Sequence, residues 1–114
     1  MAHAIVDANE VEAQHGVFKP MRQHLGVQAF GINMLELPAG GQGPEHDHAG
    51  DGQEEVYVII RGGGTIRVDG EDAELHPGHF VFLSPDAKRQ MIAGGEGLAW
   101  VGIGSSPGSY TPRQ

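Results

Sequence analysis

Residues 40–62, GGQGPEHDHAGDGQEEVYVIIRG, decide both the fold and the site. One residue separates His46 from His48, which places both imidazoles on one face of an extended chain. Glu55 lies at the start of the next expected strand and can bring a carboxylate beside them. Two imidazoles and a carboxylate suit Fe, Mn, Zn, Ni or Co and leave positions open for water or substrate. We therefore predict one divalent metal ion, held by His46, His48 and Glu55.

Glycine and proline divide the rest of the chain into short extended segments. The 114 residues include 19 glycines, more than double the usual share, and seven prolines. This composition is typical of an all-β fold with many short strands. The dipeptide Asp69-Gly70 predicts a two-residue type I′ hairpin turn, and the glycine runs at 62–64 and 94–97 are expected to be turns. No segment of ten or more residues has clear helical periodicity, so no helix is expected. The expected strands are 4–7 (an edge strand), 16–19, 27–37, 54–61, 65–68, 72–75, 79–83, 88–93 and 98–103.

The spacing in residues 40–62 resembles the first motif of the cupin superfamily. That motif reads Gly, five residues, His-x-His, three or four residues, Glu, six residues, Gly. Gly40, His46 and His48 match it directly, and so do Glu55 and Gly62. The gap between His48 and Glu55 is six residues, two or three longer than in the family. We interpret the surplus within 49–52 as a flexible loop insertion, which costs little free energy.

A second segment resembles the second cupin motif in its looser form. Gly70, the run Pro77-Gly78-His79, an apolar strand at 80–83 and Pro85 match it. The resemblance covers roughly residues 30–104 and implies a small single-domain cupin, an all-β jelly-roll barrel (double-stranded β-helix). On this basis we expect an N-terminal arm with edge strands at 1–26, the barrel at 27–104 and a C-terminal tail at 105–114. The resemblance does not select a function, because cupins include dioxygenases, isomerases, epimerases, decarboxylases, lyases, storage proteins and sensors.

One position departs from the family pattern. The family's fourth metal ligand, a histidine four residues after the proline, falls on Arg89. A guanidinium does not deprotonate in proteins and cannot bind a metal. Either the three remaining ligands hold the metal with waters, while Arg89 grips a carboxylate or phosphate of the substrate, or the metal is lost and Arg89 pairs with Glu55 or Glu54. We favour the first alternative, because the three-ligand set is chemically sufficient.

Several neighbours of Glu55 are secondary candidates. The six-residue count to Gly62 selects Glu55 over Glu54, whose side chain faces the other way in a regular strand. In a regular strand the side chain of Gln53 lies on the same face as that of Glu55. It is therefore a candidate substitute metal ligand, or a candidate hydrogen-bond donor to one of the metal ligands. Arg89 and Tyr57 are the candidate catalytic residues, although for Tyr57 core packing with the hydroxyl bonded to the backbone is the commoner role.

The remaining large or titratable residues receive structural interpretations. His76 and His79 flank the turn at Pro77-Gly78, so we expect both to be exposed and inert. The glycines at 62–64 lack the helix start and Lys-Ser/Thr of a phosphate-binding loop, and we predict no organic cofactor. The residues expected in the core are Phe80, Phe82, Met91 and Trp100.

The net charge and the composition of the chain limit which binding partners are expected. The formal net charge of −8 argues against nucleic acid. No apolar run approaches a membrane span and no signal peptide is visible, so we expect a cytoplasmic protein without membrane contact. There is no cysteine, which excludes disulfides and thiolate metal sites. Exposed sheet edges and the N-terminal arm lead us to expect a homodimer.

These features define two main functional hypotheses. The first is a metal-dependent enzyme, namely a mononuclear oxygenase, isomerase or lyase, acting on a small anionic organic molecule. The alternative is a non-catalytic module that binds or senses a small ligand, with or without metal. A purely structural barrel with an empty site is a third possibility.

Overall fold

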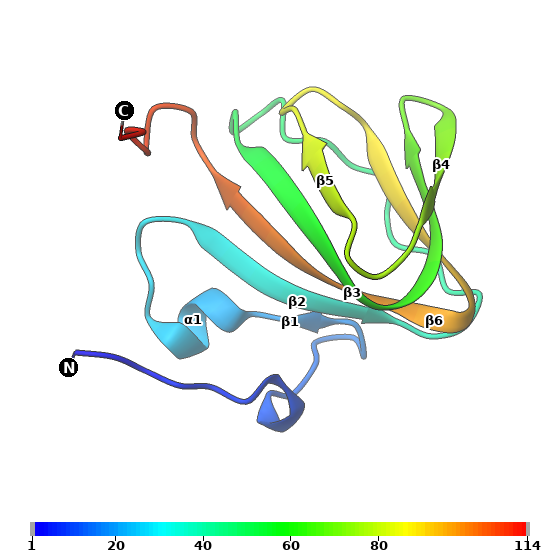
Figure 1. The fold of residues 1–114 in the computed structure, drawn as a ribbon, viewed down its shortest axis with the longest axis horizontal. Helices are drawn as coiled ribbons and strands as arrows, with labels where there is room; N and C mark the ends of the chain where they lie inside the picture. Colours follow the sequence, from blue (N-terminus) through cyan, green and yellow to red (C-terminus); the bar gives the residue numbers. More distant parts are fainter. Residues whose placement is uncertain (1, 114) are drawn as a thin grey trace.

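The computed structural model describes residues 2–113, and nearly half of them form one antiparallel β-sheet that curls into a barrel (Figure 1). The strands are β1 (Phe18–Lys19), β2 (Gly31–Leu37), β3 (Glu54–Val68), β4 (Glu71–Leu75), β5 (Phe80–Leu83) and β6 (Arg89–Ser105). They pair in the order β1-β2-β6-β3-β4, with β5 also paired to β3. The fold is the expected all-β barrel.

Two strands are far longer than predicted. Segments 54–61 and 65–68 lie in the single strand β3, and segments 88–93 (from Arg89 on) and 98–103 lie in β6. The glycine runs between them are bends within strands, not turns. A Cβ at Gly62 or Gly64 would lie 2.1 Å from a carbonyl oxygen of β6. The register between β3 and β6 shifts at this point. Only glycine allows so close an approach, so the two strands bend together.

The N-terminal region also differs from expectation. Residues 4–7 form no edge strand, and the arm instead makes a 3-10 turn, Ala8–Glu10, capped by the side chain of Asp7. A five-residue helix, α1 (Met21–Leu25), follows Pro20 and ends at Gly26, whose φ is +79°. A single helical turn is too short to produce a detectable period in the sequence. The predicted strand near 16–19 is present as β1, which pairs with the edge of β2.

The hairpin predicted at Asp69-Gly70 is confirmed. Both residues have positive φ, +50° and +84°, as a type I′ turn requires. The turn joins β3 to β4 with Val68 opposite Glu71. The second half of β3 is thereby fixed against β4, while its first half pairs with β5.

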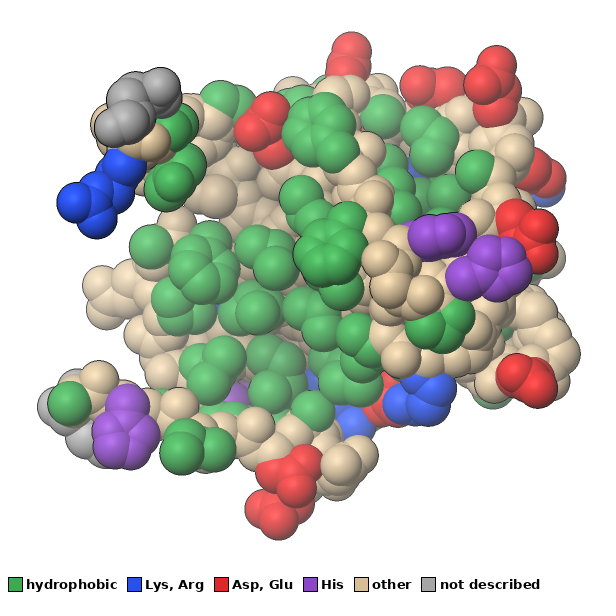
Figure 2. Space-filling model, in the orientation of Figure 1, with side chains coloured by type: hydrophobic (Ala, Val, Ile, Leu, Met, Phe, Trp, Pro, Cys, Tyr) green, Lys and Arg blue, Asp and Glu red, His purple; other side chains and the backbone are tan. Residues whose placement is uncertain are grey.

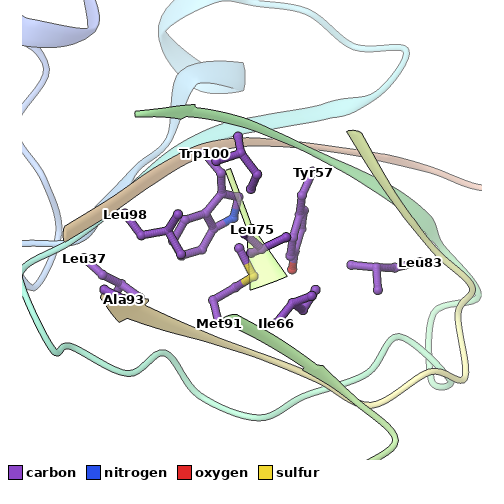
Figure 3. Close-up of a cluster of buried hydrophobic side chains, with 10 residues drawn as sticks. Leu37, Tyr57, Ile66, Leu75, Leu83, Met91, Ala93, Leu98 and Trp100 are labelled. Atoms are coloured by element: carbon purple, nitrogen blue, oxygen red, sulfur yellow. The ribbon is translucent and has the colours of Figure 1, made fainter. Parts of the chain in front are cut away.

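The core lies inside the barrel (Figure 3). Met91 and Trp100 are each 3% exposed, as predicted. Phe80 and Phe82 are not in the core: they are 75% and 61% exposed. Successive side chains alternate along β5, and this strand directs Val81 and Leu83 inward, so its phenylalanines point outward. The buried cluster comprises Leu37, Tyr57, Ile59, Ile66, Leu75, Leu83, Met91, Ala93, Leu98 and Trp100.

Candidate metal centre

Both candidate histidines lie in the loop between β2 and β3, and this loop is held against β6. The backbone N–H of Gly43 donates to the carbonyl oxygen of Met91 at 2.9 Å. Further along, His46 and Arg89 exchange backbone hydrogen bonds of 3.0 and 2.9 Å. The N–H of His48 donates to the carbonyl of Pro85 at 2.7 Å. These bonds fix an otherwise irregular segment and place its imidazoles beside Glu55 at the start of β3.

The structure brings His46, His48 and Glu55 together. One potential ligand atom from each lies within 4.8 Å of the other two. The Nε2 atom of His48 is 3.3 Å from Oε1 of Glu55, and the two imidazole rings are 5.5 Å apart in an edge-to-face arrangement. His46 is exposed, whereas His48 and Glu55 are half-buried. Within residues 2–113 this is the only group of three or more histidine or carboxylate side chains that could hold a metal ion.

The hydrogen bonds of both imidazoles suit a metal ligand. Nδ1 of His46 lies 3.3 Å from the carbonyl oxygen of Pro44, and Nδ1 of His48 lies 3.1 Å from both carboxylate oxygens of Asp51. With Nδ1 engaged as a donor, Nε2 of each neutral ring keeps its lone pair for a metal. The donor set therefore fits a divalent ion of the first transition series.

Asp51 is a site residue that the sequence reasoning missed. It belongs to the segment 49–52, for which the sequence predicts a flexible loop insertion. Its hydrogen bond to His48 is the main reason that the pKa of the Asp51 carboxyl is lowered. The same carboxylate also accepts the backbone N–H of Gln53 at 3.1 Å. The inserted loop thus supplies the carboxylate that orients the His48 imidazole. The feature of the sequence that could have indicated this contact is a carboxylate three residues after a ligand histidine.

Arg89 is completely buried directly behind the ligands. Its exposed fraction is 0%. The guanidinium donates to the carbonyl oxygens of Ala87 at 2.7 Å and Ser84 at 3.4 Å, and it lies 3.5 Å from Oε1 of Glu55. Arg89 therefore pairs with Glu55 and not with Glu54. Among the described residues its Nε atom has no hydrogen-bond partner. A contact between Arg89 and a substrate stays a prediction.

Tyr57 combines both of the roles considered for it. The ring is 4% exposed and packs in the core, 5.9 Å from the ring of Trp100. Its hydroxyl donates to Oε1 of Glu55 at 3.2 Å, a carboxylate and not the expected backbone group. Burial raises the pKa of Tyr57, with a further contribution from Glu55, so the hydroxyl stays protonated and remains a donor. Oε1 of Glu55 thus lies close to His48, Tyr57 and Arg89.

The remaining candidates lie outside this cluster. Glu54 is exposed, as its parity predicts. Gln53 is half-buried, and its amide oxygen lies 3.1 Å from where a Cβ on Gly104 would be, so it packs against β6. His76 and His79 are exposed, as predicted; Nδ1 of His79 accepts the backbone N–H of His76 at 3.0 Å.

Comparison with known proteins agrees with this architecture. Among solved structures, a cupin protein from Bacteroides fragilis is 26% identical, with 100% of this chain and 92% of that chain covered and a TM-score of 0.84. A predicted oxalate decarboxylase from Thermotoga maritima is 18% identical, with coverage of 89% and 97% and a TM-score of 0.73. A polyketide cyclase from Streptomyces resistomycificus is also 18% identical, with coverage of 89% and 78% and a TM-score of 0.76.

A match to a family model shows to which family the chain belongs. No curated protein matches the chain. No helix of the described residues is long and apolar enough to cross a membrane. The family model for the cupin domain matches residues 33–103, which include all three candidate ligands, Tyr57 and Arg89. The chain is therefore a member of the cupin family.

Proposed function

We propose that this cupin is a mononuclear metal-dependent enzyme acting on a small anionic organic molecule. His46, His48 and Glu55 would hold the metal. The observation that carries the proposal is the convergence of their ligand atoms within 4.8 Å, directly beside a fully buried arginine. A bound divalent ion would supply Lewis-acid chemistry, or one-electron chemistry if it were iron.

The positive charge of Arg89 supports an anionic substrate. A neutral histidine at the fourth-ligand position would leave a metal ion and Glu55 with a combined charge of about +1. Arg89 raises this to about +2, and burial prevents water from screening it fully. A carboxylate entering the site would offset this excess.

The shape of the site limits the size of the substrate. Tyr57, Trp100 and Met91 pack together inside the barrel (Figure 3), and the hydroxyl of Tyr57 donates to the ligand Glu55. His46 is the one exposed residue of the three ligands, so a substrate would approach past it. Tyr57 and Arg89 would then hold the Glu55 carboxylate in place from behind, while the filled interior excludes water. One structural neighbour is described as a predicted oxalate decarboxylase, and oxalate is a carboxylate small enough to test first.

Metal binding is tested by direct measurement. The purified protein is expected to contain close to one equivalent of a transition metal by elemental analysis, or to take up Mn, Co or Zn by titration calorimetry with a rise in melting temperature. The double variant His46→Ala/His48→Ala should lose this binding. Its matched control, His76→Ala/His79→Ala, removes two exposed histidines elsewhere and should retain it. Failure of all three metals to bind the wild-type protein would refute the proposal.

Catalysis needs a separate assay. Small carboxylates and keto acids, beginning with oxalate, are incubated with the metal-loaded protein, and substrate loss and oxygen consumption are followed. Turnover that requires the metal and both histidines supports the enzyme. Tight binding of a carboxylate that is never consumed supports the alternative, a non-catalytic binding or sensing module.

A further inference from the structure

A hollow lies between the C-terminal segment and the outer face of the sheet, near the end of β6. Its volume is about 560 Å³, and sites for small molecules measure about 300–1,000 Å³. Its floor includes Val56, Ile103 and Phe82, which lie opposite one another across β3, β6 and β5. The neighbouring Tyr57 is buried in the core, so these three side chains point outward, where Figure 2 shows hydrophobic side chains gathered. The hollow is therefore separate from the metal centre.

A tight turn reverses the C-terminal segment beside this floor. Ser106-Pro107-Gly108-Ser109 has the pattern of a type II turn, with proline second and glycine third. The φ of Gly108 is +90°, and the N–H of Ser109 donates to the carbonyl oxygen of Ser106 at 3.2 Å, as in that turn. The hydroxyl of Ser109 donates to the same oxygen at 2.7 Å. Tyr110 follows directly and lines the hollow together with Pro107. The turn thus places an aromatic ring at the hollow.

Three aromatic side chains from distant parts of the chain line the hollow. Phe30 precedes β2, Phe82 lies on β5 and Tyr110 lies in the C-terminal segment. They are 39%, 61% and 76% exposed, so each ring keeps surface that the fold does not use. The face of an aromatic ring carries partial negative charge and attracts a cation that lies within about 6 Å of the ring centre. The lining therefore favours a cation over an anion.

The side-chain charge at the hollow is also negative. Glu54 lies two residues before Val56 on β3, so its carboxylate is on the same outer face. Within residues 2–113 no lysine, arginine or histidine lines the hollow, and no ion pair involves Glu54. Glu55 also contributes to the lining, but its carboxylate is on the inner face, 3.5 Å from Arg89. The described part of the chain thus leaves the charge of Glu54 uncompensated.

We propose that this hollow binds a small organic cation that carries a quaternary ammonium group. The charge of such a group is spread over its methyl groups, which pack against aromatic and aliphatic side chains while the ring faces and Glu54 attract the charge. A primary ammonium fits less well, because it has three N–H donors and is strongly hydrated, whereas the side chains around the hollow are mainly apolar. The net charge of −8 raises the local concentration of cations around the protein.

The ligand is a free cation and not a lipid headgroup. Phosphatidylcholine carries the same quaternary ammonium, but its phosphate would approach Glu54 and the acidic surface of the protein. A free cation carries no such phosphate.

Titration calorimetry with choline tests this site. We expect saturable binding of one choline per chain, and about tenfold weaker binding of its uncharged isostere, in which carbon replaces the nitrogen. Equal affinities for the two compounds would overturn the inference, because the hollow would then recognise apolar volume alone. Absence of choline binding at millimolar concentration would also overturn it. Protein that floats with phosphatidylcholine vesicles but does not bind choline would overturn it in favour of the headgroup.

Matched variants locate the binding. Glu54→Gln and Phe82→Leu should each weaken choline binding about tenfold. Phe80→Leu alters the other exposed phenylalanine of β5, which does not line the hollow, and Glu71→Gln alters an exposed carboxylate on β4; both should bind choline as the wild type does. Choline affinity that is unaffected by Glu54→Gln and Phe82→Leu would overturn the inference. Circular dichroism and retained metal binding would show that all four variants are folded, and none of these outcomes bears on the metal site.

Discussion

His46 and Arg89 lie directly opposite each other as a hydrogen-bonded antiparallel pair. Each donates its backbone N–H to the carbonyl oxygen of the other, at 3.0 and 2.9 Å. In such a pair the two Cα atoms are about 5.5 Å apart. The position that carries the family's fourth ligand is therefore next to the first one, and here it carries an arginine that pairs with Glu55.

Replacing this arginine by the family's histidine should strengthen metal binding. Arg89→His offers a fourth donor beside His46 and removes a buried positive charge that repels the metal. We expect the dissociation constant for Co or Zn to fall about tenfold, equivalent to 1.4 kcal/mol. Titration calorimetry measures this change. Arg89→Leu removes the charge without adding a donor, so equal affinities of the two variants would show that the imidazole does not reach the metal.

The ligand histidines could be predicted from the sequence because their geometry is local. Two side chains separated by one residue share a face whenever the chain is extended, and parity then selects Glu55 over Glu54. The contact between Asp51 and His48 depends on the conformation of a loop, which spacing does not encode. The pairing of Arg89 with Glu55 depends on β6 lying beside the loop and β3, a long-range contact.

The strands show the same division between local and long-range information. The Asp69-Gly70 turn could be predicted because both residues must adopt positive φ within the turn itself. The glycines at 62–64 carry the same local signal, yet they form a bend. What they accommodate is the backbone of β6, which lies roughly thirty residues further along the chain. Likewise, β5 is apolar on both faces, so its pattern alone could not show which face lies in the core.

Neutralising Glu55 should abolish metal binding and lower the free energy of unfolding. Glu55→Gln keeps the size of the side chain but leaves the buried guanidinium of Arg89 without its anion. We expect loss of metal binding and a decrease of about 2 kcal/mol in the free energy of unfolding, measured by urea denaturation. Glu54→Gln alters the adjacent exposed carboxylate and should change neither. Equal stability losses in both variants would argue against the pairing of Glu55 with Arg89.

Asp51 should matter for metal affinity more than for stability. Asp51→Ala frees the Nδ1 atom of His48, so the imidazole is no longer held with Nε2 toward Glu55. We expect metal affinity to fall about tenfold. Asp47→Ala removes an equal charge from the same loop but no contact to a ligand imidazole. Comparable losses for the two variants would mean that overall negative charge, and not the orientation of His48, is responsible.

The stability that Glu36 contributes should depend on pH. Its hydrogen bond to Lys19, with the charge of Arg61 nearby, lowers the pKa of Glu36 below 4.5 in the folded protein. The ionised carboxylate therefore stabilises the fold above pH 4.5, and this contribution disappears as the pH falls through the lower folded-state pKa. We expect Glu36→Gln to lose about 1 kcal/mol at pH 7 and nearly nothing at low pH. Urea denaturation at both pH values tests this, and a loss independent of pH would contradict it.

The paired bend of β3 and β6 should be intolerant of any side chain at Gly64. A Cβ there would lie 2.1 Å from the carbonyl oxygen of Ile92, and the nearby atoms are all backbone, so the two strands would have to separate. We expect Gly64→Ala to lower the free energy of unfolding by about 3 kcal/mol. In Gly95→Ala the new Cβ meets nothing within 4 Å, and that variant should be close to wild type. Because the bend also positions the first half of β3, Gly64→Ala should weaken metal binding at Glu55. A variant of full stability would show that β3 and β6 can move apart at no cost, which would contradict the role assigned to these glycines.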